Sequence, residues 1–72
     1  MAHPEMTPVT SSNLRSVGYD AAKKDLYVSF KSGGTYVYHG VPAETHQAMI
    51  GAPSSGSFLA SSVKGHFPFE RV

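Results

Sequence analysis

The strongest candidate for binding chemistry in this sequence is a serine- and glycine-rich tetrapeptide formed by Ser54, Ser55, Gly56 and Ser57. It precedes Phe58, Leu59 and Val63, whose spacing predicts a helix that ends at Gly65. Free backbone N–H groups and the helix dipole favour an anion at a helix start, glycine allows close approach, and the hydroxyls add donors. The alternative interpretation is a plain serine cap followed by a turn glycine.

Two basic residues are candidates to assist this anion site. Lys64 lies near the other end of the predicted helix, and Arg71 lies in the C-terminal tail. Either side chain can supply a charge-assisted hydrogen bond to a phosphate. The predicted ligand-binding set therefore consists of the tetrapeptide, Lys64 and Arg71.

A second candidate is one face of a predicted sheet, which carries Tyr27, Lys31, Val37 and His39. An aromatic ring beside a cation can stack on a base while the cation holds a phosphate. The alternatives are an exposed strand face or a subunit interface. The interface is favoured of these two, because the apolar surface of Tyr27 and Val37 needs to be covered. Arg15, at the start of the first strand, can serve a ligand at the sheet end or pack its stem over the core.

Catalysis and metal binding have little support in the sequence. The four histidines are scattered over arm, strand, helix and tail: His3, His39, His46 and His66. Metal binding needs converging ligands, and no serine sits in a motif that presents a nucleophile on a sharp turn. Asp20 and Asp25 are explained as turn residues. We therefore expect no catalytic residue, no metal, no cofactor and no enzymatic activity.

Three strands are predicted from apolar side chains that alternate with polar ones. The alternating residues are Val17 and Tyr19, then Leu26, Val28 and Phe30, then Tyr36 and Tyr38. Pairing Asp20 with Asp25 sets Tyr19 opposite Leu26 and Val17 opposite Val28. The strands form a three-stranded antiparallel meander.

The second hairpin admits two registers. A two-residue Gly33, Gly34 turn would place the tyrosines on the face away from Phe30. A three-residue loop of Ser32, Gly33 and Gly34 sets Phe30 opposite Tyr36 and gathers the large residues on one face. We favour the second register, which makes the tyrosines mainly core residues.

A first helix is predicted after the meander. Pro42 suits its first turn, Glu44 favours its positive start, and Gly51 followed by Pro53 ends it. The residues expected to press on the sheet are Ala48, Met49 and Ala52, while His46 and Gln47 are expected to face water. The fold class is α+β, with a three-stranded antiparallel β-meander packed on one face by two short helices.

Length and composition bound the domain organisation. A length of seventy-two residues predicts a single domain, over residues 9–72, and two prolines without periodicity predict a flexible arm over residues 1–8. The chain has no cysteine, so self-association is the common reinforcement left to so small a domain, and we expect a homo-oligomer. The N-terminus lacks an apolar stretch long enough for a signal peptide or membrane span, which predicts a cytoplasmic protein.

An ordered set of residues runs through most of the chain: Val9, Ser11, Ser12, Val17-Gly18-Tyr19-Asp20, Leu26, Val28, Phe30, Gly33, Tyr36, Tyr38, Val41-Pro42, Ala52, Ser54, Gly56, Phe58, Val63 and Lys64. This set resembles the KTSC domain, which is named for its occurrence at the C-terminus of some lysyl-tRNA synthetases and also occurs as a free-standing protein. The family has no known activity, and the synthetase context implies RNA binding. Ala60 and Phe67 depart from the pattern, which frequently has Asn and Tyr there.

Two classes of function follow. The first is a non-catalytic binding protein that captures an anionic nucleotide-type ligand, such as a signalling nucleotide that a phage or its host would benefit from sequestering. The second is an accessory RNA-binding module. The formal net charge of +1 favours the first, because duplex binding through many phosphates needs a broad positive field.

Overall fold

The structure, a computed structural model, describes residues 4–9 and 11–72. Its first hairpin joins β2 (Leu14–Asp20) to β3 (Asp25–Phe30) in the predicted register, with Asp20 opposite Asp25 and Tyr19 opposite Leu26. The Asp20 carboxylate accepts hydrogen bonds from the amides of Ala22 and Lys23, which explains an aspartate at the start of this turn.

The second hairpin joins β3 to β4 (Thr35–His39), and here the predicted pairing is wrong by two residues. Val28, rather than Phe30, lies opposite Tyr36. The loop does have three residues, but they are numbers 31–33, because Phe30 N donates to the Gly34 carbonyl at 3.1 Å. Since a shift of two residues preserves the pleat, the tyrosines still share the core face with Phe30.

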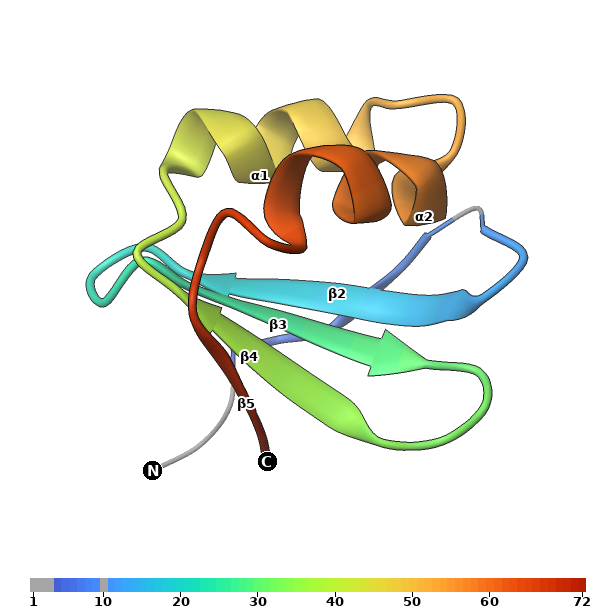
Figure 1. The fold of residues 1–72 in the computed structure, drawn as a ribbon, viewed down its shortest axis with the longest axis horizontal. Helices are drawn as coiled ribbons and strands as arrows, with labels where there is room; N and C mark the ends of the chain where they lie inside the picture. Colours follow the sequence, from blue (N-terminus) through green and yellow to red (C-terminus); the bar gives the residue numbers. More distant parts are fainter. Residues whose placement is uncertain (1–3, 10) are drawn as a thin grey trace.

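Two further strands extend the meander, so the sheet has five strands in the order β1-β2-β3-β4-β5 rather than three (Figure 1). β1 (Thr7–Pro8) pairs with β2, and β5 (Phe69–Arg71) pairs with β4, both antiparallel. These strands have two and three residues, and their side chains are exposed. The sequence lacks the alternation that would have predicted them, because neither strand has a buried face.

The first helix, α1 (Ala43–Ile50), begins after Pro42 and ends at Gly51, as predicted. Met49 is fully buried, but Ala48 is exposed, contrary to expectation. His46 is half-buried rather than facing water, and its ring stacks on Tyr19 with centroids 4.8 Å apart. A short helix with few apolar residues leaves the side that faces the sheet poorly specified by the sequence, and this accounts for both differences.

The second helical segment has Ser54 as its N-cap. It consists of α2 (Ser55–Phe58) followed directly by the π-helical η1 (Leu59–Val63). The π turn is closed by Lys64 N, which donates to the Leu59 carbonyl at 2.8 Å. Gly65 follows with φ of +82°, a left-handed conformation that glycine adopts without strain.

Both helical segments cover the same face of the sheet (Figure 1). The core between the two layers consists of Leu14, Val17, Leu26, Val28, Tyr38, Val41, Met49, Leu59 and Val63. Burial of each of these side chains contributes roughly 1.5 to 3 kcal/mol relative to exposure. Within the described residues, no helix is long and apolar enough to cross a membrane.

Candidate functional site

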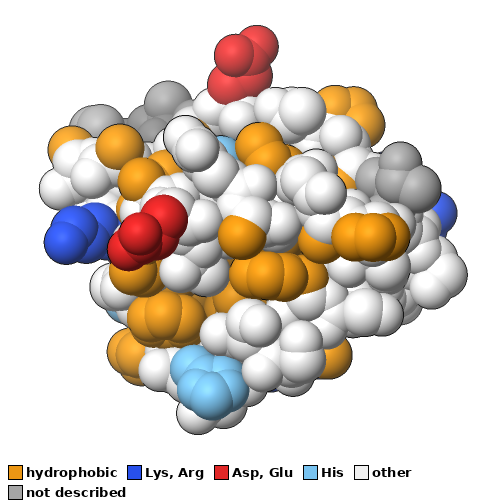
Figure 2. Space-filling view, turned by 90° about the horizontal axis from the view of Figure 1, so that it is seen from above, with side chains coloured by type: hydrophobic (Ala, Val, Ile, Leu, Met, Phe, Trp, Pro, Cys, Tyr) orange, Lys and Arg blue, Asp and Glu red, His pale blue; other side chains and the backbone are white. Residues whose placement is uncertain are grey.

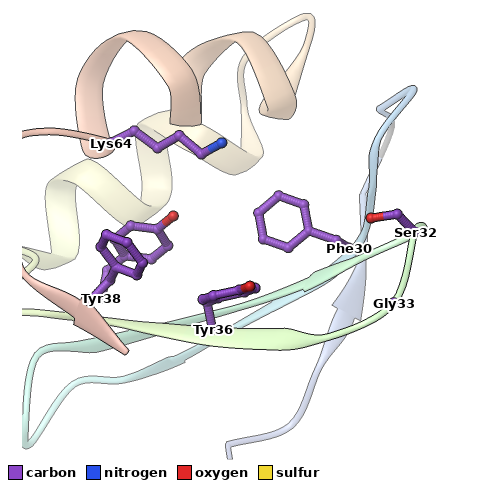
Figure 3. A pocket seen from close by; sticks show the side chains of 7 residues that line it. Phe30, Ser32, Gly33, Tyr36, Tyr38 and Lys64 are labelled. Carbon is purple, nitrogen blue, oxygen red and sulfur yellow. The ribbon is translucent and has the colours of Figure 1, made fainter. Parts of the chain in front are cut away.

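An aromatic pocket opens where the second hairpin, the end of η1 and the tail meet. Its lining consists of Phe30, Ser32, Gly33, Tyr36, Tyr38, Lys64 and Phe69, and its volume is about 480 Å³. Figure 3 shows Lys64 above the space and Tyr36 below it, with Phe30 and Tyr38 on either side. Small-molecule sites have volumes of roughly 300 to 1,000 Å³, so the pocket is large enough for a compact ligand.

The rings of this pocket form a connected group. Phe30 and Tyr36 meet edge to face with centroids 5.6 Å apart, and Phe69 lies 6.0 Å from Tyr36 and 5.4 Å from Tyr38. Tyr38 is only 2% exposed, whereas Phe69 is 58% exposed. The inner wall is therefore fixed by the core, while Phe69 presents an aromatic surface to solvent.

The hydroxyl of Tyr38 is neutral in the physiological range. Burial raises the pKa of Tyr38 above its usual value, and the neighbouring Tyr36 raises it further. A neutral phenol can donate as well as accept a hydrogen bond. In Figure 3 this hydroxyl points toward the space below Lys64, where a polar group of a ligand can reach it.

Two cations stand at the edge of the aromatic group. Lys64 Nζ lies 5.6 Å from the centroid of the Phe30 ring, a cation–π distance. Arg71 lies opposite Tyr36 in the β4–β5 pair. Its guanidinium is next to Gly34, since the Nη2 atom of Arg71 would be 3.4 Å from a Cβ added to Gly34. Among residues 4–9 and 11–72 the ion pairs all involve His39, so neither cation has a carboxylate partner.

A second hollow, of about 570 Å³, lies between β1 and the end of α1. It is lined by Thr7, Pro8 and Val9 on one side and by His46, Gln47, Ile50 and Gly51 on the other. Burial lowers the pKa of His46, which keeps its ring neutral. This hollow is larger than the aromatic pocket, but the described residues that line it include no charged side chain, so the aromatic pocket is the better site for an anion.

Two of the three serines predicted to bind an anion use their hydroxyls within the protein, whereas Ser57 is exposed and takes part through its backbone. Ser54 Oγ accepts from Ser57 N at 3.3 Å, as expected of a helix cap. Ser55 is 2% exposed, and its hydroxyl donates to the Met49 carbonyl at 3.1 Å. The structure does not bring this tetrapeptide together with Lys64, because the tetrapeptide opens the helical segment and Lys64 closes it. Arg71 lies in β5, opposite Tyr36 of β4.

Gly56 has a packing role in the tetrapeptide. A Cβ at this position would lie 2.3 Å from Asn13 Oδ1 and 2.7 Å from Ser11 Oγ, both closer than real contacts allow. Ser11 Oγ also accepts from the amides of Asn13 and Leu14. Gly56 therefore lets the second helix pack against the turn that precedes β2.

The second predicted set is only partly assembled. Tyr27 and Val37 are cross-strand neighbours on the face away from the helices, and Val37 is buried. Lys31 instead lies in the hairpin loop, where Nζ donates to the Ser11 carbonyl at 2.8 Å. Arg15 is exposed at the irregularity between Leu14 and Ser16, where the register of β2 shifts.

His39, the remaining member of that set, is held by two carboxylates. Its Nδ1 atom lies 2.9 Å from Asp25 Oδ1, and its Nε2 atom lies 3.0 Å from Glu70 Oε2. The hydrogen bond with Asp25, followed by that with Glu70, raises the pKa of His39 above the usual histidine value. Within the described residues, no three such side chains are arranged to hold a metal ion.

The KTSC domain model matches residues 10–67. The chain belongs to the KTSC domain family. In the crystal structure of a KTSC domain protein from Yersinia pestis, the fold superposes with a TM-score of 0.91 at 38% identity, covering 94% of this chain and 96% of that one.

Relatives of this KTSC domain occur alone and within larger proteins. A protein of Tsukamurella paurometabola is 40% identical over 62 residues, which cover 86% of this chain and 92% of the relative. A lysine–tRNA ligase of Nostoc punctiforme is 31% identical over the whole chain, which spans 13% of the ligase. The domain is thus found both in lysyl-tRNA synthetases and in free-standing proteins.

Sequence reasoning missed four members of the aromatic pocket: Phe30, Tyr36, Tyr38 and Phe69. It assigned the first three to the core and Phe69 to a tail that covers the core. A signal for the pocket was available in the sequence, namely the Tyr36, Tyr38 pair together with the apolar tail. Together these segments contain more aromatic residues than a small core needs. Of the two positions that depart from the family pattern, Ala60 is exposed and Phe67 packs partly against the core.

Proposed function

We propose that this KTSC domain is a non-catalytic binding protein that captures a small anionic ligand of the nucleotide type. The observation that carries the proposal is the aromatic pocket of Phe30, Tyr36, Tyr38 and Phe69 with an unpaired cation at its edge. A planar base stacks on the exposed Phe69 or on Tyr36, and the phosphate contacts Lys64.

The energetics of such a site suit a nucleotide. Stacking of one base on an aromatic side chain contributes about 1 to 3 kcal/mol. A hydrogen bond from a lysine or arginine to a phosphate is charge-assisted and contributes about 1.5 to 3 kcal/mol. Arg71, next to Gly34 at the pocket edge, supports a second phosphate contact, since a guanidinium donates in a fork that matches phosphate oxygens.

The second candidate is an accessory RNA-binding module, and the lysine–tRNA ligases among the relatives favour it. The aromatic pocket also suits one base of a single strand. Charge weighs against a long contact, because the net charge is only +1. On the helix side, Figure 2 shows Lys and Arg side chains only at the margins of the described surface, with apolar patches between them.

Salt dependence separates the two candidates. A nucleotide held in a pocket by one or two cations loses little affinity as salt rises, whereas RNA bound through several phosphates weakens steeply and log-linearly. The measurement is calorimetry with a panel of linear and cyclic nucleotides and with a mixed single-stranded RNA, each at two salt concentrations. Tight, salt-steep RNA binding with no nucleotide bound would overturn the proposal.

A pair of variants tests whether the ligand binds in the aromatic pocket. Phe69→Ala removes an exposed pocket ring and should weaken nucleotide binding about 5- to 100-fold, in line with one lost stacking contact. Ile50→Ala is the matched control, because Ile50 is also a half-exposed apolar residue but lies at the end of α1. Equal affinities of the two variants would place the ligand elsewhere.

The expected homo-oligomer stays a prediction. Native mass spectrometry of protein recovered from cells measures the mass of the assembly and of any small molecule that it retains. A monomer that retains a nucleotide would support the pocket and remove the need for a subunit partner.

A further inference from the structure

The side chain of His39 ties three neighbouring strands together. His39 ends β4, and its two ring nitrogens contact Asp25 of β3 at 2.9 Å and Glu70 of β5 at 3.0 Å. These carboxylates are the charged groups that act on the ring, one from each strand beside β4. The three side chains lie on the face of the sheet opposite the helices, away from the aromatic pocket.

Both contacts are favourable only when the imidazole is protonated. A neutral imidazole has one N–H donor and one acceptor lone pair, while both nitrogens of the imidazolium donate. The two hydrogen bonds, the one to Asp25 first, raise the pKa of His39. The stabilisation is therefore fully present below the unfolded value of about 6.5 and is lost as the pH rises through the higher folded value.

Loss of the proton affects the two contacts unequally. Asp25 is the more buried carboxylate, with its side chain 14% exposed, against 66% for Glu70. The single remaining N–H thus stays with Asp25, which leaves the Nε2 lone pair facing a Glu70 carboxylate oxygen. Two acceptors at this distance repel, which favours displacement of the exposed Glu70.

Besides the Glu70 contact, β5 is held by its backbone pairing with β4 and by the Phe69 ring, which contacts Tyr36 and Tyr38. β5 has three residues, all exposed, and lies at the edge of the sheet. The segment is also held by backbone hydrogen bonds from His39 N to the Pro68 carbonyl and from Val72 N to the Thr35 carbonyl. An exposed edge strand of this length opens easily, so a single side-chain contact can shift its opening equilibrium.

We propose that Asp25, His39 and Glu70 form a proton-dependent clamp that holds β5 on β4 and thereby positions Phe69 and Arg71 at the aromatic pocket. Glu70 lies between these two residues in sequence and points to the other face, as alternation along a strand requires. The clamp couples the two faces of the sheet through one strand. His39 is a positioning residue, because it contacts none of the pocket side chains.

The test measures opening of β5 in the ligand-free protein. Protection factors of the His39 and Val72 amides are determined by hydrogen exchange between about pH 5.5 and 8.5, while the carbon-bound ring protons report the titration of His39. Protection at both amides should fall about two- to fivefold as His39 loses its proton, the range of a partly exposed ion pair. Protection of the central-strand Val28 amide should stay constant.

Two variants decide the chemistry. In Glu70→Gln the carboxamide can donate to the Nε2 lone pair of neutral His39, so protection at Val72 should no longer fall with rising pH. His66→Gln is the matched control, since His66 is exposed in the turn after η1, and it should keep the wild-type pH profile. A flat profile in the wild type, or a wild-type profile in Glu70→Gln, would overturn the clamp.

The consequence for ligand binding rests on the proposed function, while the clamp itself does not. If the clamp holds and the pocket binds nucleotide, the affinity for adenosine 5′-monophosphate should fall about two- to fivefold over the same pH range, and Glu70→Gln should remove that dependence. Because exchange is measured without ligand, a protein that binds no nucleotide can still confirm the clamp. A protein that binds nucleotide with flat exchange profiles would refute it.

Discussion

The two ends of the second helical segment present polar chemistry in opposite ways. At its start, Ser54 caps the helix and the Ser55 hydroxyl makes a buried hydrogen bond, while Gly56 allows a close contact with the turn before β2. At its end, Lys64 stands over an aromatic ring with no carboxylate partner in the described part of the chain. A group is therefore free to bind a ligand only when folding has not already used its hydrogen-bonding capacity.

The largest effect is expected at the helix start and concerns stability. Gly56→Ala places a methyl group against Asn13 and Ser11 and should lower the free energy of unfolding by about 1 to 3 kcal/mol. Thermal melts followed by circular dichroism measure the loss. Gly51→Ala is the control, since its added Cβ would be 3.4 Å from one carbonyl oxygen, and similar losses in both would contradict the packing role of Gly56.

The next effect is expected at the other end of the helix and concerns binding. Lys64→Met should weaken nucleotide binding roughly 10- to 100-fold, since a charge-assisted hydrogen bond is lost, while stability changes little. Calorimetry of the folded variant gives the affinity. Lys23→Met removes the same charge in the exposed turn between β2 and β3 and should bind as the wild type does. Equal losses in the two variants would indicate a nonspecific charge effect.

A smaller effect is expected from the helix cap. Ser54→Ala removes the side-chain acceptor for Ser57 N and should cost about 1 kcal/mol of stability without changing the affinity for nucleotide. Ser57→Ala should cost less, because Ser57 takes part in the cap through its backbone amide. If Ser54→Ala weakened anion binding in the folded protein, the helix start would be a binding site after all.

The smallest effect is expected in the hairpin loop. Lys31→Met removes an exposed hydrogen bond to the Ser11 carbonyl and should change stability by less than about 1 kcal/mol, with nucleotide affinity unchanged. Denaturant titration and calorimetry on the same sample give both values. A loss of affinity as large as that of Lys64→Met would move the proposed cation from the end of η1 to the hairpin.

Much of the fold was predictable because its signals are local. Alternation in Leu26 and Val28 predicts a strand, and Pro42 and Gly51 mark the ends of α1. The register of the first hairpin follows from parity and a short turn. The edge strands were missed because Thr7–Pro8 and Phe69–Arg71 bury no side chain and are defined only by backbone pairing.

The candidate site also has a part that could be predicted from the sequence and a part that could not. Residue type alone identifies the side chains that can bind a phosphate, and Lys64 and Arg71 are among them because a basic side chain carries its charge in any fold. Only the tertiary structure decided which of them meet aromatic rings. The π turn at the end of η1 sets Lys64 over Phe30, and the pairing of β5 with β4 brings Phe69 beside Tyr38. These contacts join residues more than thirty positions apart, and a separation of that length leaves no periodic signal in the sequence.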